Sequence, residues 1–404
     1  MFSEHFELFT EGDLLYEAML ASISTAQHQV LLESYIFADD EIGRRFAAAL
    51  IERAQRGVTV RLHLDAAGSL FWASHQLINR LRRNGVTVRW FHRWSWRHPW
   101  RYNRRNHRKL LVVDGSCAYV GGFNIHRENS HAVYGDARWR DTHIGFSGAL
   151  ATQAMDLFTR FWIGRKRPPV LHPPESGSIL LSNFSRGGRR YLNGSFADMV
   201  SHARQTIYLT TPYFVPNRRT QRLLCEAAQR GVDVRLLVPR KNDMPLAQWA
   251  AHAAYETLLD SGVRIFEYLP RLLHSKTTVV DGAHATVGTS NIDYRSFFLN
   301  YELNLFTHES VLCERLRAVF LEDLQQAEEE YRKAAQRTLE LVERERGAAE
   351  LDARIAAVRE AGRGVARGVG CGGMCHREPL VEVVGADGRH TVYTHVTPET
   401  VPGL

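Results

Sequence analysis

The sequence predicts an α/β protein made of two copies of one unit, each a mixed sheet within an α/β/α sandwich. The segment "AQRGVTVRLHL" at 54–64 returns as "AQRGVDVRLLV" at 228–238. Upstream of it, "AQHQVLLESYIF" at 26–37 matches "ARQTIYLTTPYF" at 203–214. In both copies short apolar runs alternate with helical patterns, which is typical of sheets that carry helices on their faces.

The two copies share one order of expected elements. A glycine ends the second helix of each copy, at Gly57 and at Gly231, where glycine is favoured as a C-cap. Nearly continuous apolar strands predict a sheet that is buried on both faces and mainly parallel. The expected elements of the first and second copies are helices at 12–25 and 193–204, with strands at 30–37, 58–65 and 86–92 and at 206–214, 232–238 and 263–269.

The chain divides into five expected parts. The proline-rich "GRKRPPVLHPPESGS" reads as a linker, and Leu312, Leu316, Phe320 and Leu324 at i+4 spacing predict a helix after the second copy. A hairpin is expected to turn at Asp387-Gly388. The expected parts are a first half at 1–163, a linker at 164–178, a second half at 179–308, a long helical extension at 309–365, and a Gly-rich loop with a β-hairpin at 366–404.

Composition bounds the partners and the compartment. The formal net charge of +7 and the pI of about 9.2 favour an anionic partner, which nucleic acid, a membrane surface or a phosphate-bearing substrate would each satisfy. The five cysteines are scattered and odd in number, so a reducing compartment is expected. The acidic start "MFSEHFELFTEGDLL" is not expected to be a signal peptide, and no apolar run approaches the roughly 18 residues of a spanning helix. Membrane contact is therefore expected from one side only.

One polar pattern occurs twice, in "NHRKLLVVDGSCAYVGGFNI" at 106–125 and in "LLHSKTTVVDGAHATVGTSNID" at 272–293. A single histidine in a strand is usually a packed or exposed residue. The same His-x-Lys-x4-Asp pattern at equivalent places of a duplicated unit is a much stronger indication of function. The candidate residues are His107, Lys109, Asp114, Asn124, His274, Lys276, Asp281 and Asn291.

These residue types suit displacement at a phosphodiester. Such a reaction needs a nucleophile, a proton donor for the leaving alkoxide, and cations around the non-bridging oxygens. One neutral imidazole can attack phosphorus while a second, protonated imidazole serves the leaving group. Two lysines and two asparagine amides can do the work of metal ions, so no cofactor and no metal are expected. Cys371, Cys375 and His376 offer three soft ligands without a fourth, which makes a zinc site there a poor prediction.

The paired motif resembles that of the phospholipase D superfamily, over roughly residues 10–308. The resemblance implies that the two halves bring both histidines into one site. It also implies a covalent phosphohistidine, with His107 as the nucleophile and His274 as the acid. Asp141 and Glu302 are expected to orient the histidines, often across the halves, and Ser290 to contact the phosphate. Asp114 and Asp281, although part of the motif, are expected chiefly to satisfy the amides of a turn.

The substrate is indicated by residues 89–109, which hold eight Arg or Lys and six aromatic residues. A solvated basic loop would explain the arginines but not the tryptophans, whereas Trp beside Arg suits a membrane interface. The expected membrane or substrate lip comprises Trp94, Trp96, Arg97, Trp100 and Arg101.

Further segments, including "ESYIF", "HRKLLVVDG", "YVGGFNI" and "TPYFVP", resemble bacterial cardiolipin synthases, in the form without N-terminal transmembrane helices. This implies transfer of a phosphatidyl group to phosphatidylglycerol, from phosphatidylglycerol or phosphatidylethanolamine as donor. It also implies a peripheral position on the cytoplasmic face of a bacterial inner membrane.

Three alternatives stay open. They are a lipid hydrolase of phospholipase D type, a metal-independent nucleic-acid phosphodiesterase, and a catalytically idle binder of anionic surfaces. Single-stranded nucleic acid could stack on the tryptophans, but the resemblance favours lipid. The two intact motifs argue against an idle protein. Glu33, a carboxylate inside an apolar strand, is expected to have a partner or to belong to the site, because burial of an unpaired charge is costly.

Overall fold

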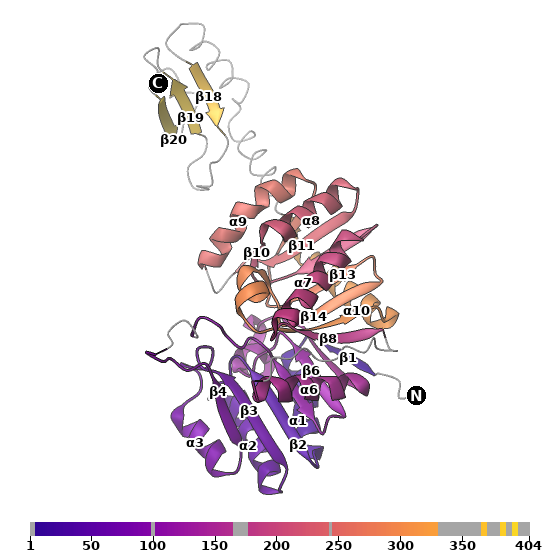
Figure 1. Cartoon of the computed structure of the whole chain (residues 1–404). Coiled ribbons are helices and arrows are strands. Elements are labelled where there is room, and N and C mark those ends of the chain that lie inside the picture. Colours follow the sequence, from indigo (N-terminus) through magenta and orange to yellow (C-terminus); the bar gives the residue numbers. More distant parts are fainter. Residues whose placement is uncertain are drawn as a thin grey trace. The chain divides into compact units, whose positions relative to one another are not determined.

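The computed structural model of the chain describes residues 5–97, 102–164, 177–241 and 245–329, together with strands at 365–369, 380–384 and 390–394. The chain divides into two compact units, Met1–Glu330 and Tyr331–Leu404. Both copies of the repeat lie in the first unit (Figure 1).

The first half of this unit carries a seven-stranded sheet, ordered β1-β7-β6-β5-β2-β3-β4. Its strands are β1 (Phe6–Phe9), β2 (Gln29–Ser34), β3 (Thr59–Asp65), β4 (Thr87–Phe91), β5 (Leu110–Val113), β6 (Cys117–Gly121) and β7 (His143–Ser147). Its helices are α1 (Gly12–Thr25), α2 (Glu41–Gln55), α3 (His75–Arg83), the short α5 (His131–Tyr134) and α6 (Ala149–Trp162).

The second half repeats this order in an eight-stranded sheet, β8-β16-β14-β13-β9-β11-β12-β17. Its strands are β8 (Ser178–Ser182), β9 (Thr206–Thr210), β11 (Asp233–Pro239), β12 (Arg264–Tyr268), β13 (Thr277–Val280), β14 (His284–Gly288), β16 (Leu303–Thr307) and β17 (Ala327–Glu329), and the short β10 (Phe214–Val215) and β15 (Ile292–Asp293) pair apart from the sheet. Its helices are α7 (Arg186–Ser201), α8 (Arg218–Gln229), α9 (Pro245–Asp260) and α10 (Ser310–Gln325). The duplication predicted from the sequence is thus a duplication of topology.

Strand direction differs from the prediction. In the first sheet β2, β3 and β4 pair in parallel, whereas the described pairings of β5, β6, β7 and β1 are antiparallel. The second sheet shows the same division. Short turns join β5 to β6 and β13 to β14, and such connections enforce antiparallel pairing. The sheets are mixed, as predicted, but not mainly parallel.

Local sequence explains several element ends. Gly57 and Gly231 follow the second helix of each half with φ of +85° and +90°, the left-handed conformation that glycine favours. Side chains that accept a hydrogen bond from the first turn cap several helices, among them α2 by Asp40, α3 by Ser74, α7 by Ser185 and α8 by Asn217.

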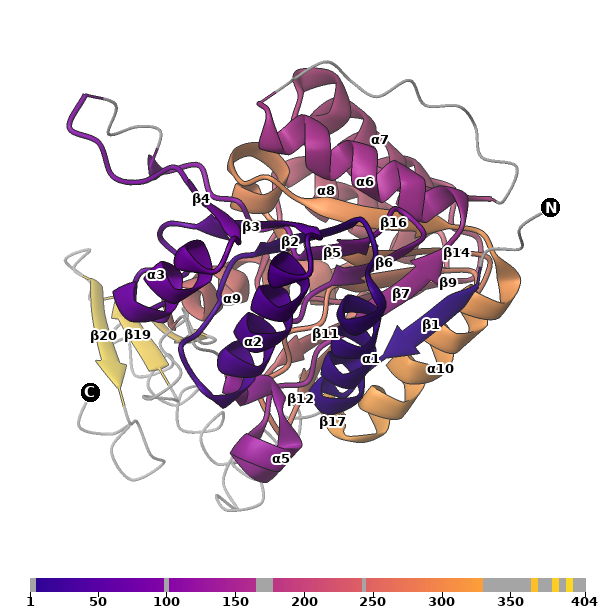
Figure 2. The ribbon, with the colours of Figure 1, turned by 90° about the horizontal axis from the view of Figure 1, so that it is seen from below.

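Three apolar clusters hold the unit together. One lies between the first sheet and α1, α2 and α3, which lie side by side over it in Figure 2, and another lies between the second sheet and α7, α8 and α9. The third joins the halves: Leu110 and Val120 of the first sheet share it with Val287 and Leu305 of the second. Because helices cover one face of each sheet and this shared core covers the other, the strands are apolar throughout.

The expected extension at 309–365 begins as α10, in which Leu312, Leu316 and Phe320 are buried. It does not continue as one helix, because β17 follows at once and pairs antiparallel with β12. Much of the expected linker, at 165–176, and residues 330–364 lie outside the described residues. None of the helices within the described ranges is both long and apolar enough to cross a bilayer.

The second unit contains a three-stranded antiparallel sheet of β18 (Val365–Val369), β19 (Leu380–Val384) and β20 (His390–Thr394). The pairing of β19 with β20 forms the hairpin expected from the sequence, although its Asp387-Gly388 turn and the Cys371–His376 segment fall outside the described residues.

Candidate active site

The two histidine motifs meet where the halves pack against each other. His107 lies three residues before the start of β5, and His274 lies three residues before the start of β13. The backbone N–H of His107 donates to the carbonyl of Tyr301 (2.9 Å), and that of His274 donates to the carbonyl of Arg140 (2.7 Å). Since Tyr301 and Arg140 belong to the opposite halves, each histidine is fixed in place by the half that does not carry it.

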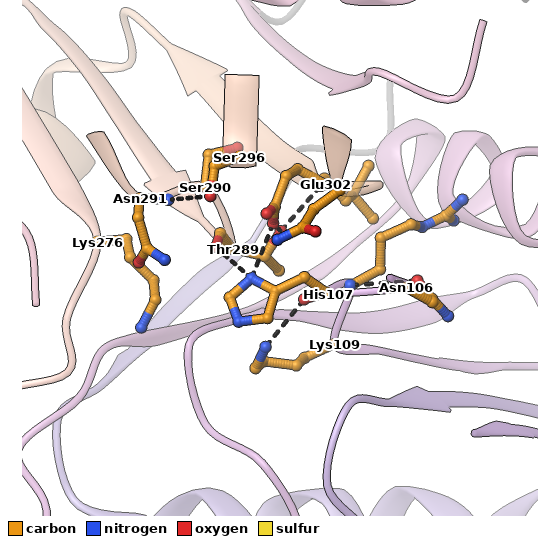
Figure 3. A network of polar contacts seen from close by, with 12 residues as sticks. Asn106, His107, Lys109, Lys276, Thr289, Ser290, Asn291, Ser296 and Glu302 are labelled. Atoms are coloured by element: carbon orange, nitrogen blue, oxygen red, sulfur yellow. Dashed lines mark hydrogen bonds and ion pairs between the residues drawn. The ribbon is translucent and has the colours of Figure 1, made fainter. Parts of the chain in front are cut away.

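A buried carboxylate from the opposite half also holds each imidazole. Glu302 Oε2 lies 3.0 Å from Nδ1 of His107, as Figure 3 shows, and Asp141 Oδ2 lies 2.6 Å from Nδ1 of His274. The carbonyl of Thr289 is a second partner of His107 Nδ1, also at 3.0 Å. Both partners of His107 Nδ1 are acceptors, so this nitrogen carries the proton, whereas Nδ1 of His274 lies near Asp141 and also 2.8 Å from Nζ of Lys276, and we assign its proton from the shorter contact with the carboxylate. In the neutral ring the other nitrogen, Nε2, then has a free lone pair for chemistry.

The two lysines fold back onto the histidines that precede them. Lys109 Nζ donates to the carbonyl of His107 (2.9 Å), and Lys276 Nζ donates to the carbonyl of His274. In Figure 3 both ammonium groups point toward the space faced by the outer nitrogen of His107. Burial, with the nearby charge of Lys276, lowers the pKa of Lys109 to about 7. Two buried ammonium groups this close favour an anion between them.

Burial favours the neutral form of both histidines. Burial, with the charge of Lys276, lowers the pKa of His274 to about 3, although Asp141 opposes the shift. Burial also lowers the pKa of His107, in this case against the charge of Glu302. A bound anion near the lysines would favour the protonated imidazole, so either histidine can gain its proton when substrate arrives.

The histidines open into a pocket of about 640 Å³. The ring of Tyr35 packs edge-on against His107 (5.2 Å between centroids), and that of Trp139 packs against His274 (5.3 Å). The remaining wall comes from Ile36, Tyr102, Asn103, Arg105, Asn124, Tyr213, Val215, Asn291, Asp293, Tyr294, Arg295 and Asn300. The sequence prediction included only the histidines and asparagines of this set. Tyr35 and Trp139 could have been predicted from the sequence, because Tyr35 directly follows a strand and Trp139 lies two residues before Asp141.

Asn124 and Asn291 line the pocket as predicted, but Ser290 does not. Asn124 Oδ1 accepts a hydrogen bond from the backbone N–H of Ile36 (3.1 Å), which leaves its amide nitrogen to donate. Ser290 instead lines a smaller cavity behind the wall, beside Phe297. Lys276 lines the same cavity, and the contact of Ser290 with phosphate stays a prediction.

The two halves differ at the residue beside each carboxylate. A Cβ on Gly122 would lie 1.9 Å from Asp141 Oδ1, so the close passage of this side chain requires glycine. The equivalent residue of the second half is Thr289, whose hydroxyl donates to Glu302 Oε2 at 2.5 Å. Glu302 therefore has an additional hydrogen-bond donor that Asp141 does not have at the matching position.

Comparison with known proteins identifies the family of this chain. Residues 19–162 and 196–324 match the family described as "Cardiolipin synthase, PLD-like domain". The chain belongs to this phospholipase D-like family. It is 34% identical to a cardiolipin synthase of Geobacillus sp. (strain WCH70) over 333 residues, which are 79% of this chain and 66% of that protein. It is 33% identical to a cardiolipin synthase of Oceanobacillus iheyensis over 336 residues, 81% and 70% of the two chains. It thus spans just under two thirds of the first of these curated relatives.

Solved structures share the fold of this phospholipase D-like chain at much lower identity. A phosphatidylserine synthase of Haemophilus influenzae Rd KW20 superposes with a TM-score of 0.63 at 15% identity, covering 80% of this chain and 87% of that one. A polyphosphate kinase from Porphyromonas gingivalis gives a TM-score of 0.57 at 14% identity, covering 81% and 48%. At such identities the likeness concerns the fold alone.

The aspartates of the family motif lie away from the pocket. Asp114 follows β5, so it is about 16 Å along an extended strand from Lys109. Its carboxylate accepts the backbone N–H groups of Gln27, His28 and Gln29 at 2.7–2.8 Å. Asp281 accepts three equivalent N–H groups, those of residues 204–206. Both aspartates have φ above +50°, and both fix the turn that leads into a central strand.

The expected lip is partly described. Trp94 and Trp96 are 53% and 87% exposed, and Arg97 is exposed, whereas Trp100 and Arg101 lie outside the described residues. The loop after β3 adds exposed side chains that the sequence prediction missed, among them Phe71 at 92%. Tyr102 connects this region to the site, because it contacts the ring of Trp94 (5.4 Å) and also lines the pocket.

Proposed function

We propose that the chain transfers a phosphatidyl group from one phospholipid to phosphatidylglycerol, as a cardiolipin synthase does. The observation that carries the proposal is the pocket that both histidines line, each histidine having the ammonium group of a buried lysine on its backbone carbonyl. The family and the names of its relatives support a lipid substrate. The transfer takes place in two steps, and particular atoms of the site carry out each of them.

In the first step Nε2 of His107 attacks the phosphorus of the donor phospholipid. The new P–N bond forms as the P–O bond to the headgroup alcohol breaks, and the leaving alkoxide takes a proton from Nε2 of His274. Glu302 favours the positive charge that develops on His107, and Asp141 favours the protonated form of His274. The donor is phosphatidylglycerol or phosphatidylethanolamine.

In the second step the acceptor attacks the phosphohistidine. The hydroxyl oxygen of phosphatidylglycerol bonds to phosphorus, the P–N bond to His107 breaks, and the proton of the hydroxyl passes to Nε2 of His274. Both histidines return to their starting states. Water in place of the alcohol would give phosphatidic acid, which is the outcome of a hydrolase.

Charge on the phosphoryl oxygens is balanced without a metal in this scheme. Lys109 and Lys276 supply positive charge in a buried setting, where electrostatic attraction is stronger than in water. The amide nitrogens of Asn124 and Asn291 supply hydrogen bonds from opposite sides of the pocket. Ser290 is given no role in this scheme, because it does not line the pocket that holds both histidines.

Peripheral membrane contact is the second part of the proposal. Trp94, Trp96 and Phe71 are exposed side chains of the size and type found at bilayer interfaces, and Arg97 lies among them. Such a surface suits an anionic bilayer, as does the net charge of +7. Lipid would then reach the pocket past Tyr102.

The test incubates purified protein with mixed phosphatidylglycerol and phosphatidylethanolamine vesicles in excess chelator, each lipid with its own acyl chains. Mass spectrometry should find cardiolipin from the wild type and none from His107→Asn or His274→Asn. His202→Asn, at a histidine whose side chain is 78% exposed, is the matched control and should behave as wild type. The acyl chains identify the donor.

Other products would assign other functions. Phosphatidic acid alone would contradict transfer and indicate a hydrolase. Unchanged lipids together with cleavage of a single-stranded oligonucleotide would indicate a nucleic-acid phosphodiesterase. Vesicle binding without any reaction would indicate an idle surface binder.

A further inference from the structure

One carboxylate in the pocket has no part in the scheme above. Asp293 lines the pocket together with both histidines, and it follows Asn291 by two residues. The equivalent residue of the first half is His126, which is buried and bound to Glu128 (2.5 Å) rather than lining the pocket. The pocket is therefore asymmetric here, with a carboxylate on the side of the second half only.

The hydrogen bonds of Asp293 leave room for a further donor. Oδ1 accepts the backbone N–H of Ser296 at 2.6 Å, at the start of the helical segment Arg295–Leu299. The hydroxyl of Ser296 is a further donor to this carboxylate, which keeps lone pairs for another donor and forms no ion pair with the residues that the structure describes. Asp141 and Glu302 differ from it, since each is held by a histidine. Burial raises the pKa of Asp293, although the N–H of Ser296 and the nearby His107 oppose this shift.

A carboxylate beside a phosphate site cannot serve the phosphate itself, because the two anions repel each other. It can accept a hydrogen bond from a hydroxyl group. At the pocket rim Arg295 supplies a charge of the opposite sign. It is exposed and anchored to Asn103, with contacts of 3.1 Å to Oδ1 and 3.0 Å to the carbonyl oxygen.

We infer that Asp293 and Arg295 form the subsite for the acceptor, with Asp293 binding one of the two vicinal hydroxyls of a glycerol headgroup and Arg295 its phosphate. This inference rests on the proposed transfer reaction. With one hydroxyl held by Asp293, the other is directed at the phosphorus on His107. Its oxygen bonds to phosphorus as the P–N bond breaks, and its proton passes to His274. Asp293 takes up no proton in this step and acts through binding alone.

The test uses Asp293→Asn, which keeps the size of the side chain and an oxygen to accept from Ser296 but removes the charge. Wild type and variant are given one donor phospholipid and an equal mixture of glycerol and 1-propanol, acceptors of the same carbon number. The ratio of phosphatidylglycerol to phosphatidylpropanol should fall about tenfold in the variant, since a hydrogen bond to a charged group is lost. Asp260→Asn, the same change at an exposed aspartate at the end of α9, should leave the ratio unchanged.

Arg295→Gln separates the second contact. The KM for phosphatidylglycerol as acceptor should rise severalfold, while the KM for free glycerol, which carries no phosphate, should not. An unchanged ratio in Asp293→Asn, or an equal loss of both products, would overturn the inference even if the wild type makes cardiolipin. Absence of all alcohol transfer by the wild type would overturn the proposed function, and the inference with it.

Discussion

The ion pair behind the catalytic strand offers a sharp energetic prediction. Arg108 lies between His107 and Lys109 and is 0% exposed, and its Nε lies 2.9 Å from Oε2 of Glu33. Its guanidinium also stacks over the ring of Phe161 at 4.5 Å. No nitrogen of this group has a well-aligned hydrogen bond within the described residues, so the charge of Glu33 is its main compensation.

The expected magnitudes follow from this geometry. Glu33→Leu leaves a buried, uncompensated guanidinium and should lower the free energy of unfolding by about 3–5 kcal/mol. Arg108→Met leaves the carboxylate in the same position and should have a similar effect, softened by the 3.4 Å contact between Glu33 Oε1 and His63 Nδ1. The double variant removes both charges and should be close to wild type, because apolar replacement of a whole buried pair is often neutral or stabilising.

The assay is a double-mutant cycle by urea unfolding, monitored by tryptophan fluorescence. A coupling energy of about 3 kcal/mol or more is expected between the two positions. Additive losses, with a double variant less stable than either single variant, would refute the reasoning. That result would mean that Arg108 is compensated by groups other than Glu33.

Three further predictions concern the site and its surroundings. Asp141→Asn and Glu302→Gln should each lower cardiolipin formation by about a hundredfold or more, measured as initial rates, because the tautomer of one histidine is lost; unchanged rates would remove the carboxylates from the account. Burial lowers the pKa of His143 to about 3, whereas in the unfolded chain it is about 6.5. The unfolded chain therefore takes up this proton first, and the free energy of unfolding decreases as the pH is lowered from about 6.5 to about 3. The imidazole of His143 is buried and has no hydrogen-bond partner among the described residues. His143→Leu should reduce the dependence of the free energy of unfolding on pH by about 1.4 kcal/mol per pH unit, measured by urea unfolding at several pH values. An unchanged pH dependence would contradict this prediction. Phe71→Ser with Trp96→Ser should reduce sedimentation with anionic vesicles severalfold, whereas Leu14→Ser, at a 62% exposed position on α1, should not; equal losses would argue against a localised contact surface.

The sequence was sufficient to predict the duplication and the meeting of the two motifs. The repeated His-x-Lys pattern is local, and two copies of one topology place it at equivalent strands. The buried partner expected for Glu33 is Arg108, a residue inside the first motif. The sequence did not identify Arg108 as this partner, because the pairing depends on which face of β2 carries Glu33 and which segment of the chain packs against that face.

Strand direction and some site residues could not be predicted for physical reasons. Apolar runs indicate burial on both faces, and here the second face is covered by α6 or α10 together with the other half, in sheets whose pairing is largely antiparallel. Ser290 and Asp293 lie within three residues of each other, yet only Asp293 lines the pocket. The irregular backbone around Asn291 decides this, and no hydrophobic periodicity encodes it. Phe71 was missed because exposure of one aromatic side chain depends on the loop that carries it.

The central claim is that one phosphatidyl group is carried on a histidine of a site shared by both halves. The most direct measurement quenches the protein during turnover of phosphatidylglycerol vesicles and maps the adduct by peptide mass spectrometry. The account predicts a phosphatidyl adduct on His107 that increases in His274→Asn and is absent in His107→Asn. An adduct on His274 instead, or cardiolipin formed at full rate by His107→Asn, would contradict it.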